Sequence, residues 1–92
     1  MIIVCYDFKD DKKRADFSKF LKQYGHRVQY SVYSIKNSKR ILQNILTEIE
    51  HKYKKRFDKT DHILIFQVCE RCEKSIIRYG RASHEVEDVV YL

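Results

Sequence analysis

The sequence predicts an α/β (α+β) fold, a ferredoxin-like βαββαβ sandwich with helices on one face and a sheet on the other. The length of 92 residues fits one domain with one core. Hydrophobic residues make up 43% of the chain, which is too large a share for a disordered protein. The expected elements follow the order β, α, β(β), α, β, β, β, which suits this sandwich. We therefore expect a single domain over residues 1–92.

The first expected elements are a strand over residues 2–6 and a helix after it. Residues 2–6 are uncharged and largely β-branched, which is typical of a strand buried on both faces. The strand runs directly into Asp7, so a carboxylate is expected at its carboxyl end. Asp10 or Asp11 can cap the helix, and Gly25 is expected to stop it. The buried side of this helix is predicted from apolar residues at helical spacing, namely Phe17, Phe20, Leu21 and Tyr24.

The middle of the chain predicts further strand structure and a second helix. Residues 27–35 alternate apolar with polar residues and are rich in β-formers. They contain no Gly or Pro, so they fit either one kinked strand or a tight hairpin turning near Tyr30 and Ser31. Asn37 or Ser38 can cap the second helix. Its predicted buried stripe consists of Leu42, Ile45, Leu46, Ile49 and Tyr53.

Three strands are expected after the second helix. Residues 63–69 have the signature of a fully buried strand, and residues 76–79 and 86–91 form two shorter strand patterns. The last of these strands is not needed to complete a four-stranded sheet within one chain. We expect residues 86–92 to be exchanged or paired at the interface of a homodimer, since pairing also helps a chain of this size to bury surface.

Positive charge is concentrated in the first two thirds of the chain, within a net charge of +6. Residues 9–27 hold seven basic and three acidic side chains, and residues 36–59 hold eight and three. This distribution favours a polyanion such as a nucleic acid as a partner, the alternative being simple solvation of Lys-rich helices. The candidate nucleic-acid-binding residues are Lys12, Lys13, Arg14, Lys19, Lys52, Lys54, Lys55 and Arg56.

Several classes of protein are disfavoured by what the sequence contains. No apolar run approaches the roughly 20 residues that span a bilayer, and residues 1–6 do not form a signal peptide. We therefore expect a soluble cytoplasmic protein with no membrane partner. With only two Gly, the chain has no phosphate-binding Gly-rich loop, and its histidines lack catalytic or ligand spacing.

The three cysteines do not predict a disulfide framework. Their number is odd, and the chain is expected to be intracellular, where thiols stay reduced. The spacing of Cys69 and Cys72 is that of a zinc ribbon, but no second pair completes four ligands. A thioredoxin-like motif is also disfavoured, because this pair follows a late strand. We expect reduced thiols at a strand end.

Asp7 is the candidate metal ligand. An ionised carboxylate at a strand terminus is a good oxygen ligand for Mg²⁺ or Mn²⁺. The alternative is that Asp7 only caps a turn.

The order of motifs resembles the family of CRISPR-associated protein two, the small subunit of spacer acquisition. The resemblance covers essentially the whole chain, and the segment Arg-Val-Gln-Tyr-Ser-Val at residues 27–32 is its most specific part. The remaining marks occur in the same order as in the family, at Tyr6-Asp7, Asp10 to Arg14, Tyr24 to Arg27, Cys69 to Cys72 and Val89-Val90.

This resemblance implies a ferredoxin-like protomer, a homodimer joined through sheet edges with exchange of the last strand, and a hairpin in residues 27–35. It also implies a place between two integrase dimers, where double-stranded prespacer DNA is bound. Many members are described as metal-dependent endonucleases that act on single-stranded RNA or on duplex DNA. The competing hypothesis is a purely architectural dimer that binds nucleic acid without cleaving it.

The resemblance also assigns the candidate catalytic residues. The family's metal-binding aspartate falls on Asp7, and its neighbouring tyrosine falls on Tyr6. The remaining positions fall on Arg14, Arg27 and Ser31. Two departures concern nuclease activity and leave the fold untouched, namely Asp16 where some members have arginine and Tyr33 where phenylalanine is common. If a two-fold axis brings both copies of Asp7 together, a hydrated cation could lie between them.

Overall fold

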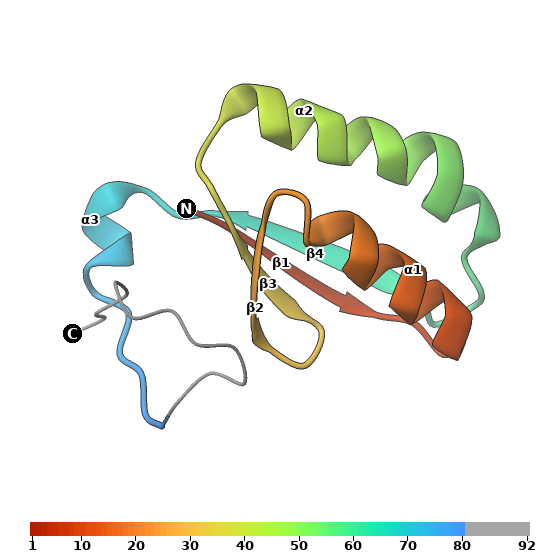
Figure 1. Cartoon of the computed structure of the whole chain (residues 1–92), viewed down its shortest axis with the longest axis horizontal. Helices are drawn as coiled ribbons and strands as arrows, with labels where there is room; N and C mark the ends of the chain where they lie inside the picture. Colours follow the sequence, from red (N-terminus) through yellow and green to blue (C-terminus); the bar gives the residue numbers. More distant parts are fainter. Residues whose placement is uncertain (81–92) are drawn as a thin grey trace.

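The computed structural model describes residues 1–80 and confirms the ferredoxin-like fold. Four strands form one antiparallel sheet in the order β2-β3-β1-β4. Helices α1 and α2 lie together on one face of this sheet (Figure 1). The strand expected at residues 86–92 lies outside the described residues, so its exchange stays a prediction.

Strand β1, Ile2–Asp7, occupies the inner part of the sheet between β3 and β4. Alternate residues face the helices, and Ile2, Val4 and Tyr6 are buried there. The other set begins with Ile3 and ends with the exposed Asp7. The face opposite the helices is called the open face below.

Helix α1, Asp11–Leu21, begins at Asp10, whose carboxylate accepts a hydrogen bond of 2.9 Å from the Lys13 backbone N–H. The prediction that Gly25 stops this helix was wrong. The helix ends at Leu21, and Gly25 is instead the first residue of β2, Gly25–Gln29. A Cβ atom on Gly25 would lie 2.0 Å from the backbone oxygen of Ser34, so glycine permits close approach to β3.

Strands β2 and β3, Val32–Ile35, form the hairpin that the sequence had left open against a single strand. The turn lies at Tyr30 and Ser31, and Ser31 adopts a φ of 65° in the left-handed region. Its carbonyl oxygen accepts a hydrogen bond of 3.1 Å from the backbone N–H of Tyr6. This bond fixes the turn against β1.

Helix α2, Lys39–Glu48, begins at Ser38, and one π-helical and one 3₁₀ turn extend it over η1, Ile49–Tyr53, and η2, Lys54–Arg56. The predicted apolar stripe is correct except at Leu46, which is 37% exposed. Ile41 packs against the core in its place, because the stripe is centred on the fully buried Ile45.

An aromatic cluster fills the core between the sheet and the helices. Phe17 of α1 lies at its centre and makes edge contacts with Tyr53 and Phe8, with ring centroids 4.8 and 5.4 Å apart. Burial raises the pKa of Tyr53 to about 12. The cluster joins α1, η1 and the end of β1, so it sets the height of α1 above the sheet.

Strand β4, His62–Gln67, is shorter than expected, and the prediction that it is fully buried was wrong, because it is partly buried on one face and exposed on the other. Leu64 and Phe66 are about half exposed on the open face, at 51% and 50%. Beyond Gln67, Val68 still exchanges backbone hydrogen bonds with Met1, and the chain then enters a short helix, α3, Glu70–Glu73.

The strand predicted at residues 76–79 is absent, and this prediction was wrong. The segment is irregular, and it borders a groove with Ile3, Val28 and Val32 of the sheet. Its β-forming residues have no neighbouring strand for backbone pairing among the described residues. Within residues 1–80, none of the helices has both the length and the apolar character needed to cross a bilayer.

Candidate functional site

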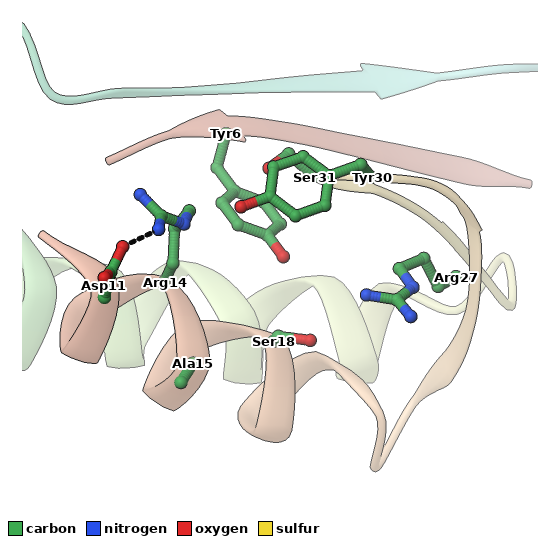
Figure 2. Close-up of a pocket in the computed structure, with 8 residues that line it drawn as sticks. All are labelled: Tyr6, Asp11, Arg14, Ala15, Ser18, Arg27, Tyr30 and Ser31. Atoms are coloured by element: carbon green, nitrogen blue, oxygen red, sulfur yellow. Dashed lines mark hydrogen bonds and ion pairs between the residues drawn. The ribbon is translucent and has the colours of Figure 1, made fainter. Parts of the chain in front are cut away.

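A cavity of about 260 Å³ lies between α1 and the β2-β3 hairpin, on the helical side of the sheet. Four of the five predicted catalytic residues border it, namely Tyr6, Arg14, Arg27 and Ser31. Figure 2 shows them with the other lining residues, which are Asp11, Ala15, Ser18 and Tyr30. The residues come from β1, α1 and the hairpin, so the fold brings them together from three elements.

Tyr6 forms the inner wall of this cavity. Its ring packs edge-on against Phe17 with the centroids 5.0 Å apart. Burial raises the pKa of the Tyr6 phenol, while a hydrogen bond with Ser18 and the charge of Arg27 act in the opposite direction. Tyr6 therefore stays neutral at physiological pH and can donate a hydrogen bond. Ser18 also hydrogen-bonds to the hydroxyl of Tyr33, the residue where the family commonly has phenylalanine.

The two arginines of the cavity differ in how they are held. The guanidinium of Arg14 donates to the backbone oxygen of Phe8 at 2.8 Å and forms an ion pair with Asp11. These contacts hold it at the mouth of the cavity. Arg27 lies opposite Tyr33 in the sheet register, which places it on the helical face. Figure 2 shows its side chain directed toward the space beside Ser18.

Asp7 lies away from this cavity. Successive side chains of a strand point to opposite faces, so Asp7 lies on the open face while Tyr6 lies under the helices. The Asp7 carboxylate is exposed and forms no hydrogen bond or ion pair with the described residues. It is therefore available to bind a cation or a ligand.

His62 is the site residue that sequence reasoning did not find. It stands directly opposite Asp7 in the pairing of β1 with β4, so both side chains are on the open face. One ring nitrogen, Nδ1, contacts the backbone oxygen of Thr60 at 3.3 Å. Only the register between two strands more than fifty residues apart brings this imidazole beside Asp7.

A single chain provides few ligands for a metal ion. No group of three or more His, Cys, Asp or Glu side chains suited to a metal occurs within residues 1–80. Asp7 nevertheless fits a hydrated Mg²⁺, which usually takes one or two carboxylates and completes its octahedron with water and phosphate oxygens. A second carboxylate from another copy of the chain would make the pair.

Lys13 is placed in a structural network rather than on an open surface. Its side chain is 14% exposed, and its ammonium lies 3.0 Å from Asp58 and 3.1 Å from the buried Asp61. The backbone N–H groups of Asp58 and Lys9 also donate to Asp61, and they lower the pKa of its carboxyl group, with Lys13 acting in the same direction. The network ties the start of α1 to the segment before β4.

The remaining predicted nucleic-acid-binding residues are largely exposed. Lys12, Lys19 and Lys55 are exposed at the surface of α1 and η2. Lys52 lies over the ring of Tyr53 at 5.3 Å, and Lys54 lies 3.4 Å from Glu50. Arg56 and Asp16 approach to 3.9 Å, which joins η2 to α1.

Fold and site together define a class of protein, a ferredoxin-like α/β domain with an exposed carboxylate at the end of β1 and an arginine-bordered cavity beneath α1. The chain belongs to the CRISPR associated protein Cas2 family, whose model matches residues 1–76. This confirms the resemblance on which the candidate residues were assigned.

Two relatives and one solved structure give the extent of this likeness. The chain is 37% identical over 71 residues to CRISPR-associated endoribonuclease Cas2 4 of Rhodospirillum rubrum, covering 77% of this chain and 55% of that protein, so it spans little more than half its length. It is 30% identical to CRISPR-associated endoribonuclease Cas2 2 of Methanospirillum hungatei, covering 97% and 96% of the two chains. A hypothetical protein from Thermus thermophilus superposes with a TM-score of 0.67 at 26% identity, covering 90% and 93%.

Proposed function

We propose that the protein is a metal-dependent endonuclease of the CRISPR spacer-acquisition machinery, acting as a homodimer on single-stranded RNA or duplex DNA. The observation that carries this proposal is the exposed Asp7 carboxylate at the end of β1, beside His62 on the open face. The names of the two relatives, both endoribonucleases, support the reaction class.

The open face supports the dimer. Leu64 and Phe66 leave apolar surface half exposed there, and β4 has no neighbour on its outer edge among the described residues. A second copy of the chain is the occupant we propose, because an exposed edge strand and an apolar face are both completed by pairing. Asp7 lies on this same face, so pairing can bring two carboxylates near a common axis.

The proposed site assigns a role to each of its residues. A bound Mg²⁺ or Mn²⁺ supplies Lewis acidity and a water of lowered pKa. The two Asp7 carboxylates would hold the cation, and His62, opposite Asp7, would accept or deliver a proton beside them. Arg14 and Arg27 bind phosphate oxygens from the helical side, where Tyr6 and Ser31 supply neutral hydrogen bonds.

The second candidate function is an architectural role. In this role, the dimer bridges integrase dimers and binds duplex prespacer DNA without cleaving it. The exposed Lys52 and Lys55 near the end of the α2 extension favour this role, because phosphate contacts bind DNA without reading its sequence. The two functions are compatible, since Asp7 and these lysines belong to different elements.

A cleavage assay with matched variants tests the nuclease. Wild-type protein, Asp7→Ala and Asp7→Asn are incubated with single-stranded RNA and with duplex DNA, with Mg²⁺, with Mn²⁺ and with a chelator. We expect both variants and the chelator to abolish hydrolysis while duplex binding and co-purification with the integrase survive. Hydrolysis by Asp7→Ala at the wild-type rate would refute the assigned site, and a purely monomeric wild-type protein in light scattering would refute the shared cation.

Charge reversal tests the architectural role. Lys52→Glu combined with Lys55→Glu should weaken duplex binding and reduce its dependence on salt, since each lost phosphate contact lowers the slope by about one. Lys36→Glu, an exposed change outside the α2 extension, is the matched control. Unchanged affinity in the double variant would remove these lysines from the DNA interface.

A further inference from the structure

Cys69 and Cys72 share one helical turn at the surface. Cys69 precedes α3, and its sulfur accepts a hydrogen bond of 3.4 Å from the backbone N–H of Cys72. Both side chains are exposed, so both are accessible to small molecules. The sequence placed these thiols at a strand end, whereas β4 has already finished at Gln67. The Cys69 sulfur therefore lies against the backbone of Cys72, and the two residues are separated by one turn on the same side of the helix.

The two thiols have opposite electrostatic surroundings. Hydrogen bonds from the backbone N–H and the thiol of Cys72 lower the pKa of Cys69. The same thiol–thiol contact, together with the charge of Cys69, raises the pKa of Cys72. One sulfur is thus favoured as a thiolate and the other retains its proton, the division found in reactive Cys-X-X-Cys pairs. Cys5 differs from both, because burial in β1 raises its pKa and no second thiol is near it among residues 1–80.

We propose that Cys69 and Cys72 form a reversible dithiol–disulfide pair that exchanges with small-molecule disulfides such as oxidised glutathione. The Cys69 thiolate attacks one sulfur of the small disulfide, which breaks its S–S bond and releases one thiolate. Cys72 then loses its proton to solvent and attacks the Cys69 sulfur, which forms the internal disulfide and releases the second thiolate. Two protein thiols are oxidised and one small disulfide is reduced to two thiols, so atoms and electrons balance.

The neighbouring contacts hold the two cysteines in this arrangement. The backbone N–H of Glu73 donates to the backbone oxygen of Cys69 at 2.8 Å, which closes the turn. The Glu73 carboxylate lies 3.0 Å from the N-terminal ammonium of Met1, so the turn is anchored to the start of β1. Asp7 lies at the other end of that strand. The exchange is therefore separate from the proposed nuclease site and does not depend on it.

Mass spectrometry of the full-length protein tests the exchange. Reduced wild-type protein, Cys69→Ser, Cys72→Ser and the control Cys5→Ser are treated with oxidised glutathione at neutral pH. We expect wild type and Cys5→Ser to lose about 2 Da, one internal disulfide, and to regain it with dithiothreitol. Cys72→Ser should retain one glutathione on Cys69. A wild-type protein that accumulates a glutathione adduct without ring closure would overturn the proposal.

Alkylation rates test the division of roles between the sulfurs. Iodoacetamide should modify Cys69 about tenfold faster than Cys5 at neutral pH, because thiolates are the reactive form. Replacing Cys72 with Ala should slow the reaction at Cys69, since the thiol that hydrogen-bonds to its sulfur is removed while the backbone N–H of residue 72 is kept. Equal rates at Cys69 and Cys5 in the folded protein would contradict the proposal. Circular dichroism spectra identical to wild type establish that the exposed substitutions leave the fold intact.

Discussion

Tyr6 and Asp7 are consecutive residues of β1, yet their side chains lie on opposite faces of the sheet. Tyr6 is packed under α1 against Phe17, while Asp7 is exposed on the open face opposite His62. The residues assigned by resemblance to one site thus form two half-sites separated by the thickness of the sheet. A substrate that uses both halves must pass over the end of β1, where the two faces meet.

This separation predicts that the two half-sites affect different kinetic parameters. Arg27→Gln should raise KM about tenfold with little change in kcat, since it removes one charge-assisted contact to phosphate. Asp7→Asn should lower kcat instead. Steady-state cleavage kinetics over a range of substrate concentrations measure both. An Arg27→Gln protein that loses kcat at unchanged KM would place Arg27 at the reacting bond.

Substitutions at the turn residue Ser31 can separate the contribution of its hydroxyl group from that of its left-handed backbone conformation. Its φ of 65° suits glycine, so Ser31→Gly should change the free energy of unfolding by less than about 0.5 kcal/mol. Ser31→Val should cost about 2 kcal/mol, because a β-branched residue is strained in the left-handed region. Urea denaturation measures both changes. Equal stability of the two variants would show that the turn relaxes out of this conformation.

Gly25 is expected to be intolerant of any side chain. A Cβ atom there would lie 2.0 Å from the Ser34 backbone oxygen, so Gly25→Ala must force β2 away from β3. We expect a loss of about 3 kcal/mol in the free energy of unfolding. Gly80→Ala is the control, because its φ of 80° carries a backbone cost while no described residue lies within 4 Å of an added Cβ atom. That variant should lose only about 1 kcal/mol, and an equal loss in both would contradict the close-approach argument.

The buried Asp61 predicts a specific acid dependence of stability. Hydrogen bonds to its carboxylate lower its pKa below the ordinary 3.8, so its ionised form stabilises the folded state above that value. This contribution is lost as the pH falls through the lowered pKa. The stability difference between wild type and Asp61→Asn should therefore be constant at neutral pH and shrink under acid conditions. Denaturation curves from pH 7 down to acid pH measure it, and a difference that grows on acidification would refute the assignment.

The same network gives one of the predicted nucleic-acid-binding residues a structural role that the sequence did not indicate. Lys13 belongs to a positive run, and the sequence counted it with the nucleic-acid-binding residues. In the folded chain, its ammonium is shared between Asp58 and Asp61, more than forty residues away. Nothing in the local pattern around Lys13 indicates these partners. Lys12 and Lys19, by contrast, are exposed as a surface role requires.

The sequence by itself determined the two helices, strands β1 and β4 and the position of Asp7 at the end of β1, while it left β2 and β3 open between one kinked strand and a hairpin. These features follow from apolar periodicity and from capping residues such as Asp10 and Ser38, which act over a few neighbouring residues. The same local patterns identified the correct family, because the motifs of the family occur in order along the chain.

Tertiary structure alone decided which candidate residues meet. The register of β1 against β4 sets His62 opposite Asp7, and the packing of α1 on the sheet closes a cavity over Tyr6 and Arg27. It also left residues 76–79 irregular despite their strand-like composition. The physical reason is that strand pairing, ion pairs and burial depend on distant segments, whose relative placement becomes defined only when the whole chain packs.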